Sequence, residues 1–411
     1  MTDSICIVTG AHLCRNPRVV KEATALVAAG FDVVVLGPEL DRALSPIDGE
    51  LAAGGGFKHE YVVRLNGTAW DRFFFRAVRR VSIELNKRLG LELPDALGYG
   101  LRATLKRART VQAGLTIGHQ EVGLWVVSKL ADEGLRVGVD IEDWYSEDLL
   151  PVAWVGRPRE LLRRLEEQVL GSAAHATSTS RAMTEALVGR YACRPPMPIY
   201  NSFPWSDRYE MDGVVKDRPD STGISLYWVS QTIGAGRGLE EVIAAMAMVQ
   251  QPLELHLRGA CSDFEWGRIE ALSSNDPRHR IVHHGLVPPA ELLSRTAEHD
   301  IGLALELDSP RSRDVTVTNK VFHYLQAGIP VIATSTSGQA ELAASAADAV
   351  QVFPISDVES LANCIRAWAE NPAALSRAKE LAVEAGSGPL RWEAQSERLV
   401  ASVKQALGSE G

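Results

Sequence analysis

A glycine-rich loop in the second half of the chain has the composition of a phosphate-binding loop. It runs over Gly234-Ala235-Gly236-Arg237-Gly238, between an apolar run at 224–229 and an amphipathic run at 239–249. Glycines let backbone N–H groups approach a phosphate closely, and the start of the following helix adds favourable partial charge. Arg237 adds a full positive charge. A tight turn with an exposed arginine is the structural alternative, because the spacing is not that of a dinucleotide-binding loop.

A second candidate anion site follows an apolar run at 301–305. The chain then passes through a loop into a predicted helix that starts with Thr318, Asn319 and Lys320. Ligands of α/β proteins bind at the carboxyl ends of the strands, and a helix start beside a lysine attracts anions. The alternative is an ordinary strand–helix–strand unit with Lys320 in solvent.

Imidazole and carboxyl side chains follow two predicted strands in the first half. His119 follows the strand at 115–118, and a cluster of acids begins at the end of the strand at 136–140. Carboxylates at a strand end suit binding of substrate hydroxyls or acceptance of a proton. We predict a role for His119 and for at least one acid, with Asp143 the best candidate; a structural histidine and solvated loop charges are the alternatives. The acids are Asp140, Glu142, Asp143 and Glu147.

Two series of short apolar runs and amphipathic stretches position these residues. Strands are predicted at 5–8, 31–36, 115–118, 136–140, 224–229, 253–257, 281–283, 301–305 and 330–333. This alternation is typical of parallel α/β structure. We therefore predict two Rossmann-like domains that face each other across a cleft, one at 1–205 and the other at 206–390. The last helix, within 391–411, is a candidate to pack back across the junction.

Charge and composition narrow the classes of partner. The formal charge of −9 argues against nucleic-acid binding, which depends on a basic surface. The five cysteines are widely spaced with no Cys-x-x-Cys pair, which favours reduced thiols and predicts neither a zinc site nor disulfides. Residues 5–8 resemble a first strand rather than part of a signal peptide, and no apolar run is long enough to span a membrane. We expect a cytoplasmic protein.

The segment 70–90 is locally basic in this acidic chain. Arg72, Arg76 and Arg80 alternate with aromatic residues such as Phe73 and Phe74. Such a segment is suited to lie on an anionic membrane surface, which would place the protein peripherally at the inner face of the membrane. The alternative is an amphipathic helix that packs on its own domain with its basic residues in water.

The segment 300–333 resembles the nucleotide-sugar region of GT-B glycosyltransferases, specifically of glycosyltransferase family 4. The matching residues are Asp300, Gly302, Leu303, Lys320, Tyr324, Gly328, Pro330 and Val331. In the family the loop and helix start bind the donor diphosphate, and a glutamate binds the ribose at the position of His323. Arg237 matches the second member of the family's basic pair, while Gln231 occupies the place of the first.

The first half resembles the same family more weakly. Residues 16–22, which include Arg18, are similar to the family's first strand–helix unit. Residues 118–121 are similar to the strand end whose histidine faces the donor sugar in the family. Residues 140–147 are similar to an acidic motif at the end of a strand. The resemblance implies a retaining transfer of a sugar from a nucleotide-sugar donor to a glycan, lipid-linked or small-molecule acceptor, with no cofactor and no metal. It implies catalytic roles for Arg237, Lys320, His119 and Asp143, donor contacts for Gly234, Gly236, Gly238, Thr318, Asn319 and His323, and acceptor contacts for Arg18, Glu142 and Glu147.

Two other functions stay open on the sequence. A non-hydrolysing nucleotide-sugar epimerase shares the fold and also needs acids near the sugar. A catalytically silent GT-B subunit that supports a partner enzyme is the other alternative, which the departures at Gln231 and His323 favour.

Overall fold

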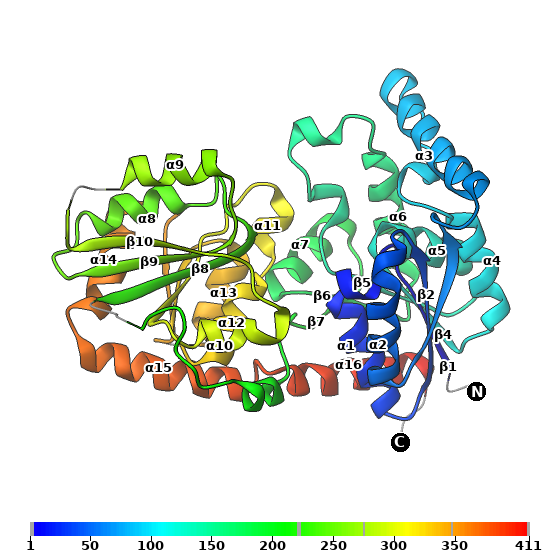
Figure 1. Cartoon of the computed structure of the whole chain (residues 1–411). Helices are drawn as coiled ribbons and strands as arrows, with labels where there is room; N and C mark the ends of the chain where they lie inside the picture. Colours follow the sequence, from blue (N-terminus) through cyan, green and yellow to red (C-terminus); the bar gives the residue numbers. More distant parts are fainter. Residues whose placement is uncertain (1–3, 220–222, 274–275, 347, 409–411) are drawn as a thin grey trace. The chain divides into compact units, whose positions relative to one another are not determined.

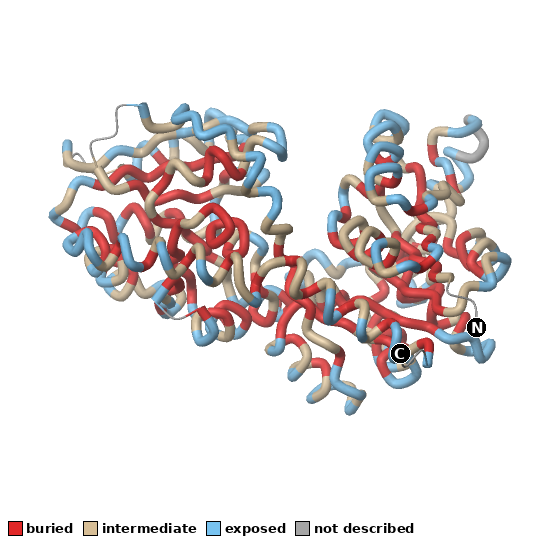
Figure 2. The backbone as a smooth tube through the Cα atoms, turned by 90° about the horizontal axis from the view of Figure 1, so that it is seen from below, coloured by how far each residue is buried: buried red, intermediate tan, exposed pale blue. Residues whose placement is uncertain are grey.

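Each half of the chain forms a unit around its own parallel sheet (Figure 1). The computed structural model describes residues 4–219, 223–273, 276–346 and 348–408, apart from the side chains of 69–71. The first unit holds the chain up to Ile199, Pro310–Ser312 and the residues from Ser396 onward. The second holds Tyr200–Ser309 and Arg313–Gln395. Buried residues concentrate on the strands of each unit and the helices against them (Figure 2).

The first unit has a seven-stranded sheet in the order β3-β2-β1-β4-β5-β6-β7. Its strands are β1 (Ser4–Val8), β2 (Asp32–Glu39), β3 (Lys58–Arg64), β4 (Leu115–His119), β5 (Val137–Ile141), β6 (His175–Ser178) and β7 (Met197–Pro198). Its helices are α1 (Pro17–Ala28), α2 (Ser45–Gly55), α3 (Ala69–Leu89), α4 (Leu101–Val111), α5 (Gln120–Asp132), α6 (Arg159–Ser172) and α7 (Arg181–Tyr191). All neighbouring strands are parallel, so the loops after β1, β4 and β5 meet at one edge.

Local sequence explains the first of these helices. The Asn16 side chain accepts a hydrogen bond from the N–H of Val19, and Pro17 occupies the first helical position, where it gives up no helical hydrogen bond. The apolar face of α1 then packs on Ile5 and Ile7 of β1. The chain's last helix, α16 (Trp392–Leu407), adds Val403 and Leu407 to the same core.

The second unit has a six-stranded parallel sheet in the order β10-β9-β8-β11-β12-β13. Its strands are β8 (Ile224–Thr232), β9 (Leu253–Ala260), β10 (His279–His284), β11 (Ile301–Ala304), β12 (Val331–Thr334) and β13 (Val350–Phe353). Its main helices are α8 (Leu239–Met246), α9 (Asp263–Leu272), α10 (Pro289–Thr296), α12 (Asn319–Ala327), α13 (Ser337–Ser345), α14 (Val358–Ala369) and α15 (Pro372–Ser387). The strand order reverses between β8 and β11, which is where ligands bind in such sheets.

The predicted fold class is confirmed in its architecture: both units are Rossmann-like α/β structures built on parallel sheets. The nine predicted strands are all present. The chain between 41 and 109, where the sequence predicted no strand, forms α2, β3, α3 and α4. Strands β6, β7 and β13 were not predicted either. Across the described residues, we find no helix both long and apolar enough to cross a membrane.

Candidate active site

The glycine-rich loop of the second unit connects β8 to α8 at the carboxyl edge of the sheet. Gly236 and Gly238 have φ angles of 68° and 74°, in the left-handed region that favours glycine. A Cβ atom at Gly238 would also lie only 2.9 Å from the Cβ of Leu305, in the loop after β11. Glycine is therefore required where two strand-end loops approach each other. Gly234 has neither constraint.

Two predicted cationic residues line the same small hollow at this edge. Arg237 enters it from the loop before α8, and Lys320 enters it from the first turn of α12. Both residues were predicted to act on the donor diphosphate, and the structure places both of them at one hollow. The other residues that line the hollow are Trp228, Gly236, Leu305, Glu306, Leu307 and Arg313.

Two charged residues of the hollow, Glu306 and Arg313, were missed by the sequence reasoning. Glu306 forms an ion pair with Lys320. Burial alone would raise the pKa of the Glu306 carboxyl, but the attraction of Lys320 and its hydrogen bond outweigh burial and lower it. Three cations and one carboxylate line the hollow, so its net charge is 3 − 1 = +2. The cations are Arg237, Arg313 and Lys320, and the carboxylate is Glu306. Such a surplus of positive charge suits a diphosphate.

The remaining donor-side predictions separate into two groups. Thr318 is the N-cap residue of α12 and its side chain makes no capping hydrogen bond, while Asn319 is exposed on the first turn, so both lie beside Lys320. His323, one turn further, is buried: its Nε2 lies 3.1 Å from Thr296 Oγ1 and its ring packs on Phe203. Burial lowers the pKa of His323 to about 4, so this imidazole is neutral at pH 7, and it is not among the residues that line the hollow. We leave it out of the proposed donor site.

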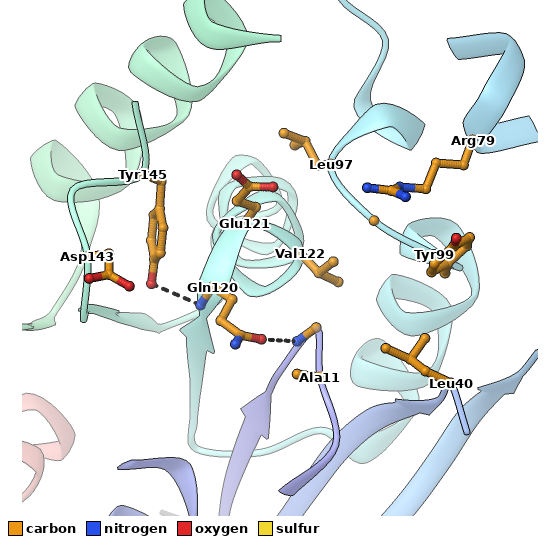
Figure 3. Close-up of a pocket in the computed structure, with 12 residues that line it drawn as sticks. Ala11, Leu40, Arg79, Leu97, Tyr99, Gln120, Glu121, Val122, Asp143 and Tyr145 are labelled. Atoms are coloured by element: carbon orange, nitrogen blue, oxygen red, sulfur yellow. Dashed lines mark hydrogen bonds between the residues drawn. The ribbon is translucent and has the colours of Figure 1, made fainter. Parts of the chain in front are cut away.

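The first unit has a larger cavity of about 350 Å³ at the carboxyl edge of its sheet (Figure 3). Of the predicted residues Asp143 lines it. The cavity combines two carboxylates, a guanidinium, an amide, two phenols and apolar surface, which is a composition suited to a hydroxyl-rich ligand. Its lining residues are Gly10, Ala11, Leu40, Arg79, Leu97, Gly98, Tyr99, Gln120, Glu121, Val122, Asp143 and Tyr145.

Gln120, and not the preceding His119, is the strand-end residue that faces this cavity. Its backbone adopts a left-handed conformation, with φ of 60°, at the first position of α5. Its side-chain oxygen accepts hydrogen bonds from Thr9 Oγ1 at 3.1 Å and from the N–H of Gly10 at 3.0 Å. The hydroxyl of Tyr145 accepts from the N–H of Gln120 at 3.0 Å (Figure 3). A strained, well-fixed polar residue at a cavity is a frequent functional feature.

His119 and Arg18 belong to a buried ionic network behind the cavity. Arg18 binds both oxygens of Asp140 at 2.7 Å and donates to the carbonyl of Ile199 at 2.8 Å. His119 lies 2.7 Å from the Glu22 carboxylate and 3.4 Å from that of Asp140. Burial favours neutral His119, but the two carboxylates outweigh it and raise its pKa to about 10. The network contains two cations and two anions, so its net charge is zero. Its ion pairs fix the ends of β4 and β5.

The other two predicted acids lie beside the cavity rather than in its wall. Burial raises the pKa of Glu142 to about 7, and Asp143 and Asp140 add to this effect while Arg18 opposes it. Glu147 is held by Arg159 and Arg163 of α6, the latter at 2.8 Å. Glu142 is thus poised near neutral pH, where a proton donor or acceptor works best, whereas Glu147 anchors the loop.

No group of three or more His, Cys, Asp or Glu side chains suited to hold a metal ion occurs in the part of the chain that the structure describes. The predicted absence of a metal requirement stays a prediction.

A family model described as glycosyl transferase-like matches residues 239–387, which include α8, Glu306 and Lys320. A comparison with curated protein sequences found no match. Apart from Pro310–Ser312, the matched segment lies within the second unit, so this unit carries a glycosyl transferase-like domain.

Solved structures resemble the whole chain. Anabaena HepE in complex with UDP-glucose is 13% identical with a TM-score of 0.68, over 98% of this chain and 99% of that one. Sucrose-phosphate synthase from Thermosynechococcus elongatus is 16% identical with a TM-score of 0.68, over 99% and 100%. The UDP-GlcNAc 2-epimerase of Neisseria meningitidis, bound to UDP-GlcNAc, is 12% identical with a TM-score of 0.57, over 97% and 99%. At these identities the likeness establishes the GT-B fold.

Proposed function

We propose that the chain is a retaining glycosyltransferase, similar to family 4, that uses a nucleoside-diphosphate sugar. The observation that carries the proposal is the convergence of Arg237 and Lys320 on one hollow with a charge of +2 at the carboxyl edge of β8 and β11. HepE, which has the same fold, was solved with UDP-glucose, so uridine diphosphate sugars are the first donors to test.

In this proposal the hollow acts on the leaving group. Charge grows on the nucleoside diphosphate as the glycosidic bond breaks, and cations fixed beside it stabilise that charge more in the transition state than in the bound donor. Arg237 is the principal contact. Lys320, already paired with Glu306, has its Nζ fixed in place and contributes the remaining N–H donors of its ammonium group.

The cavity of the first unit would hold the acceptor. Asp143 would accept a hydrogen bond from the attacking hydroxyl, Gln120 would orient a neighbouring hydroxyl, and Tyr99 would offer an apolar face. Asp143→Asn should therefore preserve donor binding while transfer falls, because the amide keeps the shape of the carboxylate but loses its charge. Loss of donor binding in this variant would contradict the assignment.

Product analysis separates the proposed function from its alternatives. The full chain is incubated with a panel of nucleotide sugars and a mixture of sugar acceptors, and the products are followed by NMR. Release of a nucleoside diphosphate with a new glycosidic bond of the donor's anomeric configuration is expected. An inverted product contradicts retention. An epimerised nucleotide sugar without diphosphate release favours the epimerase, and donor binding without turnover favours the silent subunit.

A further inference from the structure

Exposed apolar side chains gather in two segments of the first unit. Large apolar residues are normally buried, and a contiguous exposed group of them marks an interaction surface. Phe73 is 66% exposed and Val152 is 79% exposed. The exposed large apolar residues of these two segments are Phe73, Phe74, Val81, Leu89, Leu91, Leu93, Leu150, Val152 and Val155.

The first of these segments is centred on α3, which projects from the rest of its unit (Figure 1). Ser82 alone is buried among the α3 side chains that the structure describes. Six basic residues against Asp71 and Glu84 give the helix a charge of 6 − 2 = +4 in an acidic chain. The basic residues are Arg72, Arg76, Arg79, Arg80, Lys87 and Arg88. The side chain of Trp70 lies outside the described residues.

The second segment, residues 149–157, lies beside α3 and has a fixed conformation. A Cβ atom at Gly156 would lie 2.9 Å from Ile83 Cγ2 and 3.7 Å from Lys87 Cβ. The indole N–H of Trp154 donates to the carbonyl of Leu149 at 2.9 Å, and the guanidinium of Arg159 lies 5.1 Å from the centre of the Trp154 ring. Because these contacts hold the loop, Val152 and Val155 stay exposed at its tip. Sequence reasoning missed this loop, since it carries no basic residue before Arg157.

We propose that α3 and the loop 149–157 together form a docking surface for an anionic lipid bilayer. Exposed Phe and Val side chains would enter the boundary between head groups and acyl chains, while the long Arg and Lys side chains would reach lipid phosphates. An acidic protein would satisfy the charge, but it does not explain apolar side chains that project singly from a helix and a loop tip rather than line a groove.

The position of Arg79 connects this surface to the acceptor cavity. Arg79 belongs to α3 and its guanidinium lies 5.1 Å from the centre of the Tyr99 ring, in the wall of the cavity (Figure 3). A helix that rests on the bilayer would therefore place the cavity beside lipid head groups. Given the proposed function, the acceptor is a sugar or hydroxyl carried by a lipid, and Arg79 is suited to its phosphate.

Vesicle sedimentation of the full chain tests the docking surface. The chain should sediment with vesicles of phosphatidylcholine and phosphatidylglycerol, not with phosphatidylcholine alone, and should be released as salt rises. Arg76→Glu with Arg80→Glu should lower the partition at least about tenfold. Val152→Ser with Val155→Ser should weaken it less. Arg102→Glu with Arg190→Glu, the same change of charge on exposed residues of α4 and α7, is the control and should bind like the wild type.

Three results would overturn the proposal. One is equal sedimentation with neutral and anionic vesicles at low salt; another is a charge-reversed α3 variant that binds like its control. Absence of binding to every vesicle would also overturn it and would leave an acidic protein as the partner. Donor binding by calorimetry is measured on each variant, so failure of this surface is distinguished from failure of the proposed function and from misfolding.

Discussion

The carboxyl edges of the two sheets both carry charged side chains, but they use the charge differently. In the first unit Arg18, Glu22, His119 and Asp140 are buried and pair to zero net charge. In the second unit three cations line a hollow with one carboxylate. Buried and paired charges are costly to disrupt and serve the structure, whereas a surplus of charge at an open edge is available to a ligand. Burial and pairing thus distinguish positioning residues from binding residues of the same chemical type.

The largest effect is expected where the paired network is broken. Asp140→Ala leaves Arg18 buried without its carboxylate and removes one of the two partners of His119. We expect a loss of about 3–5 kcal/mol in the free energy of unfolding of the first unit, measured by urea denaturation of the full chain. The control is Glu60→Ala, because Glu60 and its partner Arg107 are each more than one third exposed and should cost about 1 kcal/mol or less. Similar losses of unfolding free energy in both variants would refute the distinction between buried, paired charges and exposed ones.

The open hollow should show the opposite behaviour. Arg237→Ala should lower kcat by about 10²–10³, the usual effect of removing one contact to developing charge. Its stability should change by about 0.5 kcal/mol or less, since Arg237 lies in a surface loop. Lys320→Ala should lower kcat too and cost more stability, because Glu306 loses its ion pair. Transfer kinetics with thermal unfolding measure both; a near-native kcat in the two variants would show that the diphosphate binds elsewhere.

A smaller, pH-dependent effect is expected from Glu142, which is neither a member of the paired network nor a residue of the open hollow. Its pKa is raised from 4.5 to about 7 in the folded chain. Between these values the folded state binds a proton that the unfolded chain has released. The contribution of Glu142 to the free energy of unfolding is therefore fully present below pH 4.5 and is lost as the pH rises through 7. In Glu142→Gln, the free energy of unfolding measured in urea should fall by about 1–3 kcal/mol less than in the wild type between pH 4.5 and pH 8. An unchanged slope would mean that Glu142 is solvated.

The fold, and the approach of Arg237 and Lys320 to one hollow, were largely predictable from the sequence. Glycines at 236 and 238, an arginine between them and a lysine at a helix start each have a local physical reason, and parallel topology brings strand-end loops together. Glu306 carried no such signal, because a single carboxylate after a strand is common. His323 was predicted from its place in a motif, and only the packing against Thr296 and Phe203 shows that it is turned into the core.

The first unit was less predictable. His119 and Gln120 are adjacent, and the left-handed backbone of Gln120 decides which of the two faces the cavity. No residue preference predicts that conformation for glutamine, because it is uncommon outside glycine and asparagine. The partners of Arg18 lie far along the chain, so its burial follows from the topology alone. The sequence left two interpretations of 70–90 open, and the structure shows a helix, α3, of which little is buried.

Calorimetric titration of the full chain with uridine diphosphate and uridine monophosphate tests the central claim most directly. If Arg237 and Lys320 hold the diphosphate, the wild type should bind the diphosphate at least about tenfold more tightly than the monophosphate, as expected for charge-assisted contacts to the second phosphate. This preference should disappear in the double variant Arg237→Ala with Lys320→Ala and persist in the control Arg377→Ala, whose arginine is exposed on α15. A double variant that retains the full preference would contradict the account.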